Sequence, residues 1–166
     1  MTRAGLLAIS AAFLGCILGA NWALATWGLV PVGLGLMAPA GVYFAGLSFG
    51  LRDAVHDLAG RLPVVALIVV GAVLSWFIEP KFAVASGVAF LLSELADFAI
   101  YDPLRNRNWP IAVTLSNIVG SVVDSAIFLW LAFGSLEFIE GQVWGKALMI
   151  VPALPVVWWA RRRRSR

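Results

Sequence analysis

Apolar runs long enough to cross a bilayer, about 20 residues each, alternate along the chain with short breaks that contain proline, glycine or charged residues. The runs are continuous and lack the strict alternation of a membrane β-barrel. This pattern predicts six helices, over residues 4–27, 32–51, 62–78, 82–101, 109–131 and 142–160. We therefore expect an all-α polytopic membrane protein with one six-helix transmembrane domain, residues 1–160, and a tail, residues 161–166.

The breaks between the runs have local causes. The stretch Val30-Pro31-Val32-Gly33 interrupts the first apolar region. Asp102-Pro103 should end the fourth helix, because a residue that precedes proline avoids helical geometry. Asn108 is a suitable N-cap for the fifth helix, and Pro110 fits its first turn, where no backbone N–H is needed.

Composition supports a membrane protein over a soluble one. Hydrophobic residues make up 61% of the 166 residues, charged residues make up 13%, and the mean hydropathy is +0.92. An average soluble domain has about 25% charged residues, so an ordinary soluble domain and a disordered chain are both excluded. At roughly 25 residues per span and its connection, the length allows six spans and no separate soluble domain.

Charge sets the expected orientation. The formal net charge is +3, and the tail alone holds five arginines, Arg161–Arg164 and Arg166. With a cytoplasmic amino terminus and six spans, all ten arginines fall on the inner side, and only Lys81 and Lys146 fall outside. This distribution follows the positive-inside rule and predicts that both termini are cytoplasmic, in the inner (plasma) membrane. A basic run directly after an apolar helix favours contact with anionic lipids over nucleic acid.

Motifs of enzymes and cofactor sites are weak or absent in the sequence. The only cysteine, Cys16, and the only histidine, His56, cannot build a disulfide or a Cys/His metal cluster. The pattern Gly46-Leu47-Ser48-Phe49-Gly50 fits G-x-S-x-G, but it lies inside an apolar helix rather than at a strand-to-helix elbow. We expect no enzyme activity, no cofactor and no metal.

Acidic and amide side chains lie inside the fourth and fifth apolar runs. Glu94 and Asp97 are three residues apart, and Asn117, Ser121 and Asp124 are spaced by four and three, so each set shares one helix face. A carboxylate at the middle of a bilayer costs about 2.5–3.5 kcal/mol on insertion scales. These faces must therefore turn toward the protein interior.

The chemistry of these faces suits a polar, donor-rich small molecule. A carboxylate accepts two hydrogen bonds side by side, and aromatic rings can stack on a flat ligand. The predicted substrate-binding residues are Phe90, Glu94, Asp97, Asn117, Ser121 and Asp124, with Tyr101 and Phe128 as further aromatic candidates. The alternative is that the acids only hold the helices together, in a membrane protein that transports nothing.

A third charged cluster covers residues 52–61, at the end of the predicted second helix. Asp53 and Asp57 are four residues apart and would share one helical face. We interpret Arg52, Asp53 and Asp57 either as a gate or ion-paired latch, or as part of a solvated loop at the cytoplasmic border.

The two acidic stretches resemble those of the queuosine precursor transporter family, also called the VUT family. That family carries two Ser-Gln-Leu-aliphatic-Asp stretches on successive helices, and residues 93–97 and 120–124 correspond to them here. Glu94 and Ser121 replace the two family glutamines, whereas both aspartates are kept. The family's acidic motif after an early helix corresponds to residues 53–60, and the resemblance covers residues 40–132.

The resemblance implies a transporter that imports a small heterocycle by alternating access. The substrate it implies is a 7-deazaguanine base, a nucleobase-like precursor of queuosine. The energy source stays open among the ligand gradient, protons and an outside partner, because related membrane subunits depend on a separate ATPase. The oligomeric state also stays open, with a homo-oligomer as one alternative.

Overall fold

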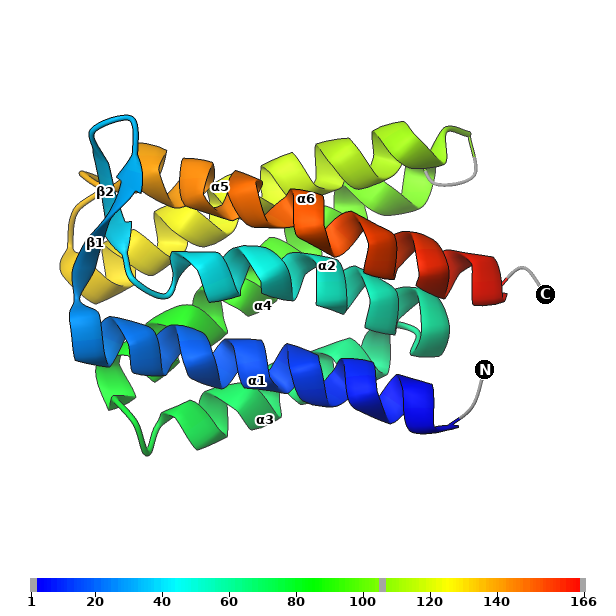
Figure 1. The fold of residues 1–166 in the computed structure, drawn as a ribbon, viewed down its shortest axis with the longest axis horizontal. Helices are drawn as coiled ribbons and strands as arrows, with labels where there is room; N and C mark the ends of the chain where they lie inside the picture. Colours follow the sequence, from blue (N-terminus) through cyan, green and yellow to red (C-terminus); the bar gives the residue numbers. More distant parts are fainter. Residues whose placement is uncertain (1–2, 105–106, 165–166) are drawn as a thin grey trace.

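The computed structural model describes residues 3–104 and 107–164, which form six helices and one two-stranded sheet (Figure 1). In chain order these are α1 (Arg3–Trp27), β1 (Leu29–Gly33), β2 (Leu36–Pro39), α2 (Val42–Ala59), α3 (Arg61–Ser75), α4 (Pro80–Leu104), α5 (Trp109–Phe133) and α6 (Ile139–Arg164). The predicted helical fold is confirmed, although several helix bounds differ from the prediction.

The largest difference is a β-hairpin where the second helix was predicted to begin. Strands β1 and β2 pair antiparallel with Gly33 opposite Leu36, and α2 begins only at Val42. The two turn residues, Leu34 and Gly35, have φ of 54° and 75°. Positive φ at both positions is the geometry of a tight type I′ hairpin turn. The prediction of helix over residues 32–41 was wrong because Pro31 and the flanking glycines favour this turn over a helix.

Other helix ends follow local chemistry. Helix α2 continues to Ala59, so the charged segment that begins at Arg52 is helical and is not a loop. Helix α4 runs through Pro103 to Leu104, slightly beyond the predicted end at Tyr101. The Asn108 side chain accepts a hydrogen bond from the Ile111 N–H at 3.3 Å, which confirms the predicted N-cap of α5.

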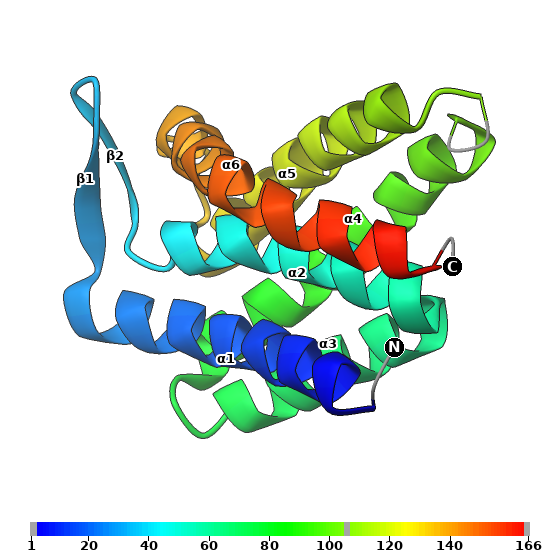
Figure 2. The same cartoon turned by 45° about the vertical axis from the view of Figure 1, so that its right-hand side comes forward.

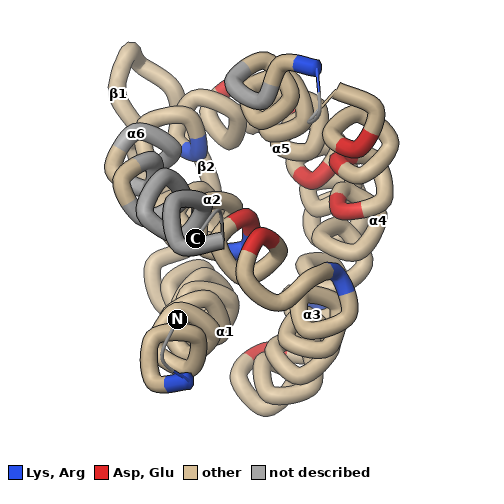
Figure 3. Tube along the Cα trace, turned by 90° about the vertical axis from the view of Figure 1, so that its right-hand side faces the viewer, with Lys and Arg blue, Asp and Glu red and all other residues tan. Residues whose placement is uncertain are grey.

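Successive helices run in opposite directions along the bundle (Figures 1 and 2). The start of α1, the α2–α3 junction, the end of α4, the start of α5 and the end of α6 lie at one end, here called the termini end. The hairpin and the α3–α4 and α5–α6 connections lie at the other end, here called the hairpin end. Figure 3 looks down the bundle from the termini end and shows acidic segments of α2 and α4 among the surrounding helices.

The outer surface is apolar, as expected for contact with lipid. Leucine, isoleucine and valine side chains are exposed on α3, α4 and α5, including Val73, Leu95 and Ile118. Three segments, Arg3–Trp27, Pro80–Leu104 and Ile111–Phe133, are long and apolar enough to cross a membrane. These helices therefore have both the length and the surface that a bilayer requires.

Exposed tryptophans gather at the hairpin end. Trp27 is the last residue of α1, Trp76 follows α3, Trp130 lies in the last turn of α5, and Trp144 lies near the start of α6. Tryptophan is enriched where a membrane meets water. This ring of side chains is typical of one membrane interface.

Candidate functional site

A buried guanidinium, that of Arg52 in α2, lies among three carboxylates. Arg52 has 0% exposure. Its Nη1 donates to Glu94 Oε2 at 2.7 Å, and its Nε and Nη2 donate to Asp53 Oδ1 at 3.0 and 2.7 Å. Nη2 also lies 3.1 Å from Asp97 Oδ1 and forms an ion pair with it. Arg52 thus links α2 to two acids on one face of α4.

Helix α5 joins this group through Asn117. The Asn117 Nδ2 donates to Asp53 Oδ2 at 3.0 Å and to the Val113 carbonyl at 2.9 Å. We call Arg52, Asp53, Glu94, Asp97 and Asn117 the Arg52 network. Within the described part of the chain, Glu94 Oε1 and Asn117 Oδ1 are buried without a hydrogen-bond partner. Such atoms are uncommon in native proteins, because an unpaired buried polar atom is costly.

A second buried ion pair joins α5 to α6. Lys146 Nζ lies 2.5 Å from Asp124 Oδ2 and 2.7 Å from Ser125 Oγ. Lys146 has 0% exposure. The charge count placed Lys146 on the outer side and Arg52 on the inner side, and the structure shows both cations buried inside the bundle. Both cations are buried because each neutralises acids that would otherwise be alone in an apolar interior.

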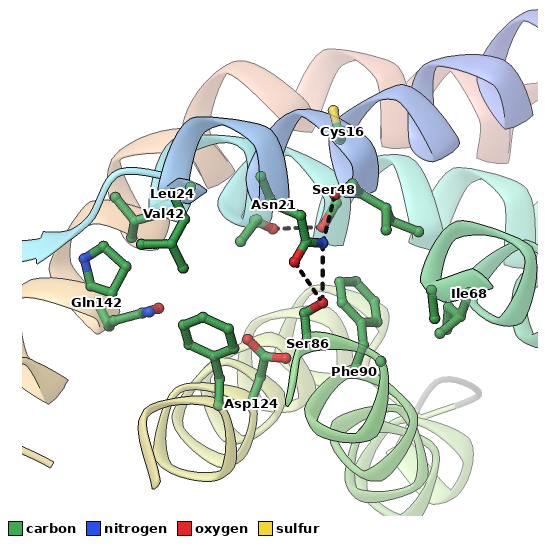
Figure 4. Close-up of a pocket in the computed structure, with 18 residues that line it drawn as sticks. Cys16, Asn21, Leu24, Val42, Ser48, Ile68, Ser86, Phe90, Asp124 and Gln142 are labelled. Atoms are coloured by element: carbon green, nitrogen blue, oxygen red, sulfur yellow. Dashed lines mark hydrogen bonds between the residues drawn. The ribbon is translucent and has the colours of Figure 1, made fainter. Parts of the chain in front are cut away.

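A cavity lies beside the Asp124–Lys146 pair, toward the hairpin end (Figure 4). About 50 Å³ of it is free for the centre of a water molecule. Figure 4 shows Asp124 and the Phe90 ring on one side of this space and Asn21 on the other, and Phe128 also lines it. The lining is mostly apolar, and its polar members are Asn21, Ser48, Ser86, Asp124 and Gln142. An apolar cavity with a few convergent polar groups is the usual form of a small-molecule site.

Hydrogen bonds hold one wall of the cavity in place. Asn21 Nδ2 donates to Ser75 Oγ at 3.2 Å and to Ser86 Oγ at 3.1 Å, and Ser86 Oγ donates back to Asn21 Oδ1 at 3.2 Å. These bonds join α1, α3 and α4. The wall is therefore formed by helices from distant parts of the chain.

Aromatic rings lie between the cavity and the Arg52 network. Phe90, which lines the cavity, stacks on Phe49 with centroids 5.4 Å apart and an interplanar angle of 19°. The Arg52 Cζ lies 5.1 Å and the Lys146 Nζ 5.8 Å from the centre of the Phe49 ring. Cations at such distances from an aromatic face are attracted to it. We call Phe49 and Phe90 the aromatic pair, and it touches both charge centres.

The family model of the putative vitamin uptake transporters matches residues 72–160. The chain belongs to this family. The match covers α4, α5 and most of α6, and so includes Glu94, Asp97, Asp124 and Lys146, whereas Arg52 lies outside it. No curated protein and no solved structure matches the chain.

Family membership confirms the resemblance found in the sequence at the level of the VUT family. Together with the apolar helices, it identifies a membrane transporter protein of a family named for vitamin uptake. A transporter family favours transport over catalysis. The particular substrate, the number of spans and the orientation are taken up below as proposals.

The predicted site residues fall into two groups in the structure. Phe90 and Asp124 line the cavity. Glu94, Asp97 and Asn117 instead belong to the Arg52 network, together with Arg52 and Asp53, which were predicted separately as a gate. The two groups meet through the aromatic pair. The structure therefore places only some of the predicted substrate residues at the cavity, and the others in the Arg52 network.

The remaining predicted residues lie near these groups. Ser121 is buried on α5 between Asn117 and Asp124, and its hydroxyl has no hydrogen-bond partner among the residues that the structure describes. Asp57 is buried too, and lines a small space of about 230 Å³ near the termini end. That space is also lined by Asp53, His56, Asp97, Tyr101 and Val113. Phe128 lines the main cavity, whereas Tyr101 does not.

Sequence reasoning missed three polar residues of the site: Asn21, Gln142 and Lys146. Asn21 interrupts a long apolar run, which was a signal that a polar side chain faces inward. Lys146 and Gln142 are four residues apart and share a face of α6. Both residues lie close to the start of that helix, so the sequence was equally compatible with side chains exposed to solvent.

Proposed function

We propose that the protein imports a small heterocycle, of the 7-deazaguanine type, across the inner membrane, and that the cavity beside Asp124 binds it. The single observation that carries this proposal is the position of Asp124, an acid on the wall of a largely apolar cavity. An unneeded carboxylate there would be costly. Its retention fits a role in recognising a ligand that donates hydrogen bonds.

The groups around the cavity suit a guanine-like ring. Such a ring presents two adjacent N–H donors beside a carbonyl acceptor. The Asp124 carboxylate can accept from both donors, and the Gln142 side-chain amide, which also lines the cavity, can donate to the carbonyl. Phe90 and Phe128 offer faces for stacking, and the Asn21 and Gln142 amides offer both donors and acceptors.

The Arg52 network would serve as the gate at the termini end. It ties α2, α4 and α5 together just beyond the aromatic pair. Opening the path from the cavity toward that end requires Arg52 to leave Glu94 or Asp97. A transporter that alternates between two open sides needs such a breakable contact on each side of its ligand.

All six helices would cross the membrane, with both termini cytoplasmic. The helices run in alternating directions, so the two ends of the chain lie on one side (Figure 1). The termini end carries Arg3, Arg61 and Arg107, whereas Lys81 lies at the hairpin end. Arg105 and Arg166 lie outside the described residues. This excess of arginine at one end supports a cytoplasmic termini end.

Binding by the purified protein tests the proposed ligand. A 7-deazaguanine base should raise the melting temperature of the wild-type protein in a dose-dependent way, because a ligand stabilises the state that binds it. Asp124→Asn should lose most of this shift. Glu140→Gln, which changes an exposed acid on the same side of the bundle, is the matched control and should keep it. A shift that is unchanged in Asp124→Asn would contradict the proposed site.

A further inference from the structure

We infer that Glu94 binds and releases a proton when the Arg52 network closes and opens, so that import is coupled to a proton gradient. This inference rests on the proposed transport function and names the ion that drives it. The evidence is the arrangement of charges and unpaired polar atoms in the Arg52 network.

Charge balance is the first argument. Asp53, Glu94 and Asp97 all contact the single guanidinium of Arg52, and Glu94 and Asp97 are almost fully buried. Asp53 alone neutralises Arg52, since it accepts two of its hydrogen bonds and one from Asn117. Two further buried carboxylates would remain without a compensating charge, and an uncompensated buried charge is expensive. The cost of this buried charge is lower if either Glu94 or Asp97 is protonated and therefore neutral.

Hydrogen bonding indicates Glu94 as that group. Two acids of the network have a buried oxygen without a hydrogen-bond partner within residues 3–104 and 107–164, Glu94 Oε1 and Asp97 Oδ1. Asp97 Oδ1 is the oxygen that lies 3.1 Å from the Arg52 guanidinium, so a cation already faces it. Arg52 instead donates to Glu94 Oε2, and this leaves Glu94 Oε1 as the position for a proton. A proton on Oε1 removes the charge without disturbing the bond from Arg52 to Oε2. Asn117 is only 6% exposed, and its Nδ2 donates to Asp53. Its carbonyl Oδ1 has no hydrogen-bond partner among the described residues. A free acceptor in the same network is an independent indication that a hydrogen-bond donor belongs there.

The other titratable groups near Glu94 do not replace this proton. Helix α2 contributes Arg52, Asp53, His56 and Asp57, and α4 contributes Asp97 and Tyr101. His56 packs against the rings of Phe98 and Tyr101, and Asp57 lies one residue away from it. Lys146, from α6, lies 5.8 Å from the centre of the Phe49 ring and is paired with Asp124. Among the described residues, no group of three or more His, Cys, Asp or Glu is arranged to hold a metal ion.

The proton would move once in each transport cycle. When the gate opens at the termini end, water reaches Glu94, the Oε1–H bond breaks, and the proton passes to water as the carboxylate forms. When the gate closes again, Glu94 regains a proton from water on the cavity side, past Phe90, which lies one turn away on α4. One proton then enters with each substrate molecule, so an acidic exterior drives import.

Infrared spectroscopy of the purified protein in lipid tests the proton itself and does not depend on the substrate. At pH 7 the wild-type protein should show the carbonyl band of a protonated carboxylic acid, and Glu94→Gln should lose it. Glu140→Gln, an exposed control, should keep the band. No such band in the wild type, or an unchanged band in Glu94→Gln, would overturn the inference.

Transport into proteoliposomes tests whether import is coupled to the proton gradient. This experiment uses the wild-type protein alone, so it can be done even if Glu94→Gln does not fold. With the membrane potential clamped, a gradient of one pH unit should accumulate a labelled 7-deazaguanine base by about tenfold, for one proton per molecule. Uptake that equilibrates without responding to the gradient, or that requires sodium ions, would overturn the inference while leaving transport intact. No uptake under any condition would count against the proposed function, and the infrared band would still decide whether Glu94 is protonated.

Discussion

Lys146 Nζ and Asp124 Oδ2 lie 2.5 Å apart inside the bundle, and this contact joins α6 to α5 at the edge of the cavity. The pair stabilises the fold only as long as both charges are present, since removing one partner leaves the other charge buried and alone.

The first prediction concerns this pair. Asp124→Asn should lower the free energy of unfolding by about 3–5 kcal/mol, because Lys146 keeps its charge without a partner. The double variant Asp124→Leu/Lys146→Met should recover much of that loss, since it removes both charges together. Thermal unfolding in detergent measures both effects. A double variant less stable than either single one would show that the pair does not act as a unit.

The second prediction concerns close packing between α2 and α6. A Cβ added at Gly46 would lie 2.7 Å from the Lys146 carbonyl oxygen, so Gly46→Ala should cost about 1–3 kcal/mol by forcing the helices apart. Gly15 has nothing within 4 Å, and Gly15→Ala should be neutral or slightly stabilising. Unfolding of the two variants side by side provides the comparison. Equal stability would contradict the packing seen between these helices.

The third prediction concerns the hairpin. Leu34 has φ of 54°, a left-handed conformation that costs an ordinary residue roughly 1 kcal/mol or more. Leu34→Asn should raise the unfolding temperature, because Asn-Gly is the preferred pair for this turn. Leu34→Ile, a β-branched control, should lower it. The opposite order would exclude this turn geometry.

The fourth prediction concerns orientation. In a Cys16→Ser background, Ser135→Cys at the hairpin end should react with a membrane-impermeant maleimide on intact cells. Arg107→Cys at the termini end should react only after the membrane is opened. Labelling of Arg107→Cys on intact cells would contradict cytoplasmic termini.

The helices could be predicted from the sequence because apolar length is a strong signal. The hairpin could not, since Val30, Val32 and Leu36 are apolar and continue the hydrophobic run. Only the turn residues distinguish a strand pair from a helix there. The later start of α2 also moves Arg52 from the expected border to the middle of its helix, where it is buried.

The acids of the site could be predicted because charged groups in apolar helices must face inward. Their partners could not, since the choice of cation for each acid depends on how α2 and α6 pack against α4 and α5. Spacing alone put Glu94, Asp97 and Asp124 at one site. The structure separates Asp124 from the other two, because Lys146 and Arg52 approach from different helices.

The most direct test of the account is uptake of a labelled 7-deazaguanine base by cells that express the wild-type protein, Asp124→Asn or Glu140→Gln, at matched amounts in the membrane. The account predicts uptake by the wild type and Glu140→Gln, with a reduction of at least about tenfold in Asp124→Asn, since a hydrogen bond to a charged group contributes about 1.5–3 kcal/mol. Uptake by Asp124→Asn at the wild-type rate would contradict it.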